Sequence, residues 1–420
     1  MIDRKVAPPF VVPDFFPLKR ASTEVLAGGI PIHFINVGDT ELLRIEIIFK
    51  AGKWYQQLKG QAVLSSKLLL EGTKSFTSVE ISSTFERNGA FFEISCGMDL
   101  MNFTIYTLNK NLPKLLPVIE EVLLAPTFPE KELEIIKNIQ IQNLKVNQKK
   151  NNFQALRLFR ENLFGKSHPY GSNTEIQDFE NLTKADLQNY YLNTLKGNFE
   201  VIIAGKINKP DYDILNHFFS KFTIRDLGSN KAQFPDVQPF QQYIEVEGSL
   251  QSSLKIGIKT LHKSAPMYFH LLIFNEVLGG YFGSRLMQKI REEKGYSYGI
   301  HSSVVQHAHE AYFVISSDVI KKFREDALTC IYEEIHKLIH TAIPTEELTT
   351  VINYFKGSFL SSINSPYALA DKFKNLHFNG LTYDYYDSMF NKLDSINPDS
   401  FQGFAEEYFN NVIFTDVSVG

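Results

Sequence analysis

The chain has 420 residues, of which 44% are hydrophobic and 21% charged, and its formal net charge is −4. This composition is typical of a globular protein, and the length exceeds one ordinary core, so we expect two or more domains. A pI near 6.3 argues against a nucleic-acid or acidic-membrane partner. The two cysteines, Cys96 and Cys330, lie far apart in sequence, which excludes a disulfide framework and favours a reducing compartment.

The first twenty residues, MIDRKVAPPFVVPDFFPLKR, contain no continuous apolar segment followed by a small-residue cleavage site. They are not rich in arginine and serine, as a mitochondrial transit peptide would be. No apolar run in the chain approaches the length of a membrane span. We therefore expect a cytoplasmic protein.

The sequence reads as two copies of one unit. The strand-like segments LRIEIIFKAG (43–52) and SLKIGIKTL (253–261) occupy matching places in the two halves. A predicted helix follows each of them, at 60–71 and at 266–278, and each helix stops at a glycine. The order of the elements is therefore the same in both halves.

The match continues further along the chain. In both TFERNGAFFEIS (84–95) and KIREEKGYSYGIHSS (289–303), a helix end runs through a glycine into an aromatic strand. FPEKELEIIKNIQ (128–140) then matches IPTEELTTVINYF (343–355), where a proline precedes a helix with acidic residues in its first turn. These features predict two homologous α+β domains, each an antiparallel sheet with helices packed on one face.

Glycine, prolines and polar residues interrupt the periodicity near the middle of the chain. We place an N-terminal domain at 1–224, a linker at 225–242 and a C-terminal domain at 243–420. Domains of this size are common.

Histidine pairs offer the first candidates for a metal site. His336 and His340 have the i, i+4 spacing of zinc ligands, but no acid lies between them that could act as a base. They sit on a strongly amphipathic segment, so a solvated helix face is the better interpretation. His307 and His309 alternate on an expected strand, and we assign them no metal either.

Other chemistries lack their motifs. The glycines of GGYFGSRL (279–286) follow a predicted helix and fit neither a P-loop nor a dinucleotide-binding fingerprint. No G-x-S-x-G elbow occurs, and neither cysteine has a basic neighbour at motif spacing.

Arg291 and Tyr298, in REEKGYSY, form the remaining candidate. A guanidinium offers a fixed fork of donors for a peptide carboxylate or carbonyl, and a phenol can donate to an oxygen that gains negative charge. The two residues are separated by a helix end and Gly295, so both could face one cleft. A surface arginine and a packed tyrosine are the alternative interpretation.

With these features in view, nearly the whole chain from about residue 20 onward resembles the pitrilysin/insulinase-type zinc peptidases, the inverzincins. It is most similar to their short-subunit branch in bacteria and in mitochondrial processing peptidases. The resemblance implies two α+β halves in each subunit, and two subunits that close like a clamshell around a chamber for unfolded peptides.

The same resemblance implies that the zinc site has been lost. The family motif is G-x-A-H-x-x-E-H-x-x-x-x-G-T. Laid on GQAVLSSKLLLEGT (60–73), it puts Val63 and Lys67 at the two histidines and Ser66 at the glutamate. The third ligand, a downstream glutamate, would fall near residues 142–144, where there is no acid. We therefore expect this chain to bind no metal and no other cofactor.

The C-terminal motif of the family, in contrast, is retained in SRLMQKIREEKGYSYGI (284–300). In the family, an arginine and a tyrosine at the positions of Arg291 and Tyr298 contact the substrate at the zinc centre. The resemblance thus implies a catalytic and substrate-binding role for both. The loop GGYFG is too short to match the glycine-rich loop of the regulatory subunit of mitochondrial processing peptidase.

Our main hypothesis is a non-zinc subunit of a heterodimeric metallopeptidase, inactive alone and active with a homologous H-x-x-E-H subunit that supplies the zinc. Extended or unfolded peptides would be the substrates, and no nucleic acid or membrane is expected as a partner. The alternative is a catalytically inactive homodimer that binds peptides or acts as a scaffold. The sequence does not identify the peptide or the partner.

Overall fold

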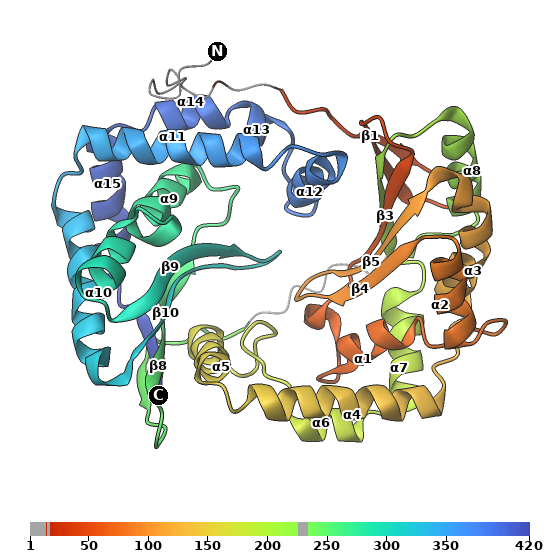
Figure 1. The fold of residues 1–420 in the computed structure, drawn as a ribbon, viewed down its shortest axis with the longest axis horizontal. Helices are drawn as coiled ribbons and strands as arrows, with labels where there is room; N and C mark the ends of the chain where they lie inside the picture. The colour runs from red at the N-terminus through yellow and green to blue at the C-terminus, as the bar shows by residue number, and fades with distance from the viewer. Residues whose placement is uncertain (1–13, 15–16, 226–233) are drawn as a thin grey trace, which may run out of the picture.

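The computed structural model describes residue 14, residues 17–225 and residues 234–420. The other residues of the predicted N-terminal domain (1–13, 15 and 16) and of the predicted linker (226–233) lie outside the described residues. The boundaries 1–224, 225–242 and 243–420 therefore stay a prediction. The described residues form two halves, each built around one sheet (Figure 1).

The sheet of the N-terminal half has six strands in the order β1-β2-β6-β3-β5-β4 among the described residues. The strands are β1 (Ser22–Val25), β2 (Pro31–Asn36), β3 (Leu42–Phe49), β4 (Phe91–Cys96), β5 (Met101–Leu108) and β6 (Phe199–Gly205). The α-helices are α1 (Gln61–Leu68), α2 (Ser78–Arg87), α3 (Leu112–Leu124), α4 (Glu130–Asn147), α5 (Asn151–Phe164), α6 (Ile176–Asn181), α7 (Lys184–Tyr190) and α8 (Lys209–Phe219).

The sheet of the C-terminal half has five strands in the order β7-β11-β8-β10-β9 in the described part of the chain. The strands are β7 (Gln241–Ile244), β8 (Gln251–Thr260), β9 (Ser297–Gln306), β10 (Ala311–Ile320) and β11 (Thr415–Val419). The helices are α9 (Tyr268–Asn275), the π-helical turns η4 (Glu276–Gly280) and η5 (Met287–Glu293), α10 (Arg324–His340), α11 (Thr345–Ser361), α12 (Pro366–His377), α13 (Asp384–Asp387), α14 (Met389–Asp394) and α15 (Pro398–Phe409).

The predicted α+β class with two similarly built halves is confirmed. The strands predicted at 43–52 and 253–261 are β3 and β8, and the helices predicted at 60–71 and 266–278 are α1 and α9, the second continued by η4. In each half a long helix, α4 or α11, occupies the place where the sequence match predicts one.

The sheets differ from the prediction in one detail, because each contains a parallel pair beside its antiparallel pairs. These pairs are β2 with β6 and β7 with β11. In both halves the last strand returns after a series of helices and lies beside an early strand. A connection of that length allows parallel pairing, whereas a tight hairpin does not.

Most helices cover one face of each sheet, as predicted, but the opposite face is covered by a helix from the other half. Helix α5 packs on β8 and β11 of the C-terminal sheet, and α12 packs on β2 and β6 of the N-terminal sheet (Figure 1). Strands β6 and β3 are accordingly buried along nearly their whole length. Because α5 follows α4 and α12 follows α11, the two exchanged helices hold the same place in the repeat.

None of the described helices combines the length and the hydropathy that a membrane-spanning helix requires.

Candidate functional site

Helix α1 keeps the packing role of the motif in which it lies. It begins at Gly60, whose φ of +84° is in the left-handed region, and a Cβ there would lie 2.9 Å from the ring of Phe179. Ala62, Leu64 and Leu68 are fully buried in the N-terminal core. The glycine and the apolar face of this helix are therefore explained by the fold alone.

The positions of the lost zinc motif offer no set of metal ligands. The hydroxyl of Ser66 is buried and donates to the backbone oxygen of Val63 at 2.8 Å. Lys67 lines a cavity of about 380 Å³ together with Ile136 and Gln140 of α4 and with Glu71. Among the described residues, α1 contributes to no group of three metal-ligating side chains. Zinc does not fit this site, because an apolar side chain, a hydroxyl and an ammonium replace its ligands.

Helices α1 and α4 lie together, as the resemblance implies. The α4 side chains that line the cavity beside Lys67 are Ile136, Ile139 and Gln140, none of which is an acid. Leu144 packs in the N-terminal core. The position of the third ligand near residues 142–144 stays a prediction.

Arg291 lies on η5 and contacts its neighbours there. Its guanidinium carbon is 4.8 Å from the centre of the exposed Phe282 ring, and its Nε is 3.5 Å from a carboxylate oxygen of Glu292. Its side chain is 37% exposed, so the guanidinium is accessible to solvent.

Tyr298 lies at the start of β9, on an edge of the C-terminal sheet. The residue is 91% exposed, whereas its neighbours in the chain make defined contacts. The Tyr296 ring stacks on Phe323 with centroids 4.5 Å apart, and the Ser297 hydroxyl donates to the backbone oxygen of Asp318 at 2.7 Å. A large aromatic side chain is thus presented to solvent from an ordered strand.

A groove of about 1020 Å³ lies beside Tyr298. It is lined by the connection between α4 and α5 (149–152), the segment 246–251 before and at the start of β8, and residues 295–298. Arg291 is not among the lining residues, so the structure places the phenol at the groove and the guanidinium beside Phe282. That both act on one substrate stays a prediction.

The histidines of the sequence analysis lie in two settings. His336 and His340 are exposed on α10, as the interpretation of a solvated helix face requires. The strand expected for His307 and His309 is wrong, because β9 ends at Gln306 and both lie in the turn before β10, where the His307 amide donates to the Glu310 oxygen. Alternation alone could not reveal the hairpin.

Two family models match the chain. Residues 39–172 match the model described as "Insulinase (Peptidase family M16)", and residues 181–355 match "Peptidase M16 inactive domain". Together these segments cover most of both halves.

Curated relatives and a solved structure agree with these matches. The chain is 22% identical over 361 residues to the "Uncharacterized zinc protease YmxG" of Bacillus subtilis, covering 84% of this chain and 86% of the relative. It is 23% identical over 391 residues to the "Non-peptidase homolog YmxG" of Helicobacter pylori, covering 86% and 84%. A crystal structure of a "peptidase M16 inactive domain" from Pseudomonas fluorescens superposes with a TM-score of 0.86 at 22% identity, covering 95% of this chain and 98% of that one.

Proposed function

Because the chain belongs to the insulinase (M16) peptidase family and lacks its zinc ligands, we propose that it is the non-zinc subunit of a two-chain metallopeptidase. The zinc and the glutamate that activates water would belong to a homologous partner subunit. This chain would contribute half of the peptide-binding surface and two side chains that contact the substrate.

The observation that carries the proposal is the exposure of Tyr298. A tyrosine that serves only packing buries its ring, whereas Tyr298 is 91% exposed as a residue and lies on an edge strand. Its hydroxyl can donate to a peptide carbonyl oxygen as that oxygen becomes negative. Arg291, on the element just before β9, can hold a substrate carbonyl or carboxylate.

The edge of β9 supports an extended substrate. An edge strand presents unpaired backbone groups, to which a peptide can add as a further strand. The groove beside Tyr298 runs along the beginning of this strand. Main-chain hydrogen bonds would then give affinity for unfolded segments of varied sequence.

A cleavage assay tests the proposal. The chain, mixed with a homologous subunit that carries H-x-x-E-H, should cleave an unfolded peptide that neither subunit cleaves alone. Tyr298→Phe should lower kcat of the pair by roughly 10²- to 10³-fold, the cost of losing one oxyanion donor, with a smaller change in KM. Tyr354→Phe is the matched control, since Tyr354 is 46% exposed on α11, away from β9.

Cleavage by the isolated chain that persists in a Tyr298→Phe, Arg291→Gln double variant would contradict the proposal. Peptide binding without cleavage in every pairing would instead favour a scaffold homodimer.

A further inference from the structure

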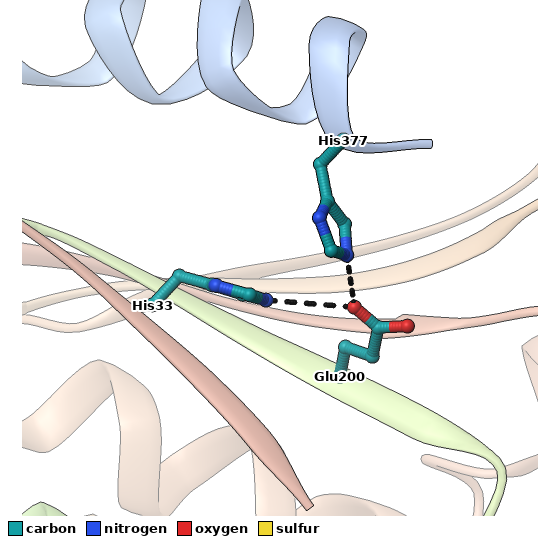
Figure 2. A group of neighbouring side chains, drawn as sticks. All are labelled: His33, Glu200 and His377. Atoms are coloured by element: carbon teal, nitrogen blue, oxygen red, sulfur yellow. Dashed lines mark hydrogen bonds and ion pairs between the residues drawn. The ribbon is translucent and has the colours of Figure 1, made fainter. Parts of the chain in front are cut away.

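Two histidines and a glutamate meet where α12 of the C-terminal half packs on the N-terminal sheet. His33 comes from β2, Glu200 from β6 and His377 from the end of α12 (Figure 2). In the described part of the chain they form a group whose ligand atoms all lie within 4.8 Å of one another. They are 167 and 177 residues apart in sequence, so no local motif indicates them.

We propose that His33, Glu200 and His377 bind a divalent transition-metal ion of the zinc type. Two imidazoles with one carboxylate are a ligand set that zinc uses, and a water can complete a fourfold coordination. Bonds of about 2.1 Å place tetrahedral ligand atoms about 3.4 Å apart. The His33 Nε2 already lies 3.4 Å from the Glu200 oxygen, whereas the His377 Nε2, which is hydrogen-bonded to that oxygen, would have to move away from it to admit the ion.

The orientation of the rings suits this role. The Nε2 atoms of both histidines point at the same oxygen of Glu200, which is 3.4 Å from His33 (Figure 2). The Nδ1 of His33 is 2.8 Å from the hydroxyl of Thr23 on β1. Such an outer hydrogen bond fixes the ring and its tautomer, as is usual for histidines that ligate metals.

The surroundings leave a route to the site. Lys50 lies 2.9 Å from the other oxygen of Glu200, and its side chain is half exposed. It can hold that oxygen while the first binds the ion, or turn toward solvent when the ion arrives. The side chain of His377 is one-third exposed, so an ion can reach the cluster from outside.

A metal here would join α12 of the C-terminal half to the sheet of the N-terminal half. This proposed metal site departs from the sequence-based expectation that the chain binds no metal. The site does not depend on the proposed peptidase role, because neither Arg291 nor Tyr298 takes part in it.

Metal titration of the full-length chain tests the site. After removal of metal with a chelator, Zn²⁺ should bind at one equivalent, and Co²⁺ should give the visible absorption of a nitrogen–oxygen site. His377→Gln should weaken Zn²⁺ binding by roughly 100-fold or more, and Thr23→Val by about 10-fold through loss of the outer hydrogen bond. His377 ends a helix at the surface, so this variant should keep the near-ultraviolet spectrum of the folded chain.

The pair His336 and His340 provides the control. Their rings are 4.4 Å apart on the exposed face of α10, where a metal could bind adventitiously. A His336→Gln, His340→Gln variant should bind Zn²⁺ as the unaltered chain does. Absence of one-equivalent binding in the unaltered chain, or equal affinity in His377→Gln, would overturn the proposal.

Discussion

Helices α5 and α12 hold the same place in the repeat, yet their contacts with the sheet of the other half differ in charge. Helix α5 meets the C-terminal sheet mainly through apolar side chains, with Phe159 and Leu163 packed among Tyr312, Val314 and Val417. Gly257 on β8 lets the Phe159 ring approach the strand, since a Cβ there would lie 2.9 Å from it.

Helix α12 also has an apolar contact with the N-terminal sheet, where Ala370 and Phe373 pack among Ile35, Ile48 and Ile202, but it adds buried charges to that contact. The Arg44 guanidinium donates to Asp371 at 2.8 Å and to the Tyr367 backbone oxygen at 2.9 Å, and the Lys374 ammonium donates to Glu46 at 2.7 Å. Arg44 and Glu46 are 5% and 3% exposed. Apolar packing is therefore common to the two helices, and the difference is the set of buried charge pairs that α12 adds.

The largest loss of stability should come from removing a buried side chain from the apolar contact between α5 and the C-terminal sheet. Phe159→Ala should lower the free energy of unfolding by about 4–5 kcal/mol, because the ring is fully buried and its neighbours lie on rigid strands. Urea unfolding measures it. Phe240→Ala, at a ring that is 54% exposed, should change stability by less than about 0.5 kcal/mol. Similar losses in the two variants would refute the assignment of α5 as an apolar contact.

A smaller loss should follow from breaking the charged contact. Arg44→Ala should cost about 3–4 kcal/mol in urea unfolding, because it leaves Glu46 buried with Lys374 as its remaining partner. An Arg44→Met, Glu46→Leu double variant should stay within about 1 kcal/mol of the unaltered chain, since it removes both buried charges. If the double variant loses more than the single one, the two buried charges do not act as a pair.

The third prediction concerns the loss of stability at low pH, which depends on His168 near α5. Burial, aided by nearby cations, lowers the pKa of His168 to about 4 from 6.5. The unfolded chain is then protonated first as the pH falls, so the stability that neutral His168 contributes is complete above pH 6.5 and is lost toward pH 4. His168→Asn should make this loss smaller by about 2–3 kcal/mol in urea unfolding at pH 6.5 and pH 4.

Burial also lowers the pKa of His33 on the α12 side, so its protonation opposes folding in acid in the same direction. The His168→Asn variant should therefore keep part of the acid sensitivity. An unchanged dependence on pH would show that His168 is not the group responsible.

Local sequence patterns predict the individual strands and helices. The strands and helices of the repeat were found because periodicity, glycine stops and proline starts act within about fifteen residues, as in β3 with α1 and β8 with α9. The loss of the zinc ligands followed from the resemblance to the family, whose motif, laid on residues 60–73, places Val63, Ser66 and Lys67 at the lost positions. The parallel strand pairs were not predicted, because pairing partners are distant in sequence.

The exchange of α5 and α12 between the halves is only weakly indicated by the sequence. The strand FEVIIAG (β6) is apolar almost throughout, and such a run is typical of a strand covered on both faces. Nothing in the sequence says which helix provides the second cover. The cluster of His33, Glu200 and His377 depends on that exchange, so it could not be foreseen from the three residues themselves.

The exchange also bears on how such a chain can be assembled. A single repeat unit would expose the apolar face of its sheet and would have a helix without a place to pack. In two such units, the helix of each unit, α5 or α12, could cover the exposed sheet face of the other, which is the geometry of a domain-swapped dimer. The chain is, in these terms, a swapped dimer whose two subunits have been joined end to end, and each half is completed only by the other.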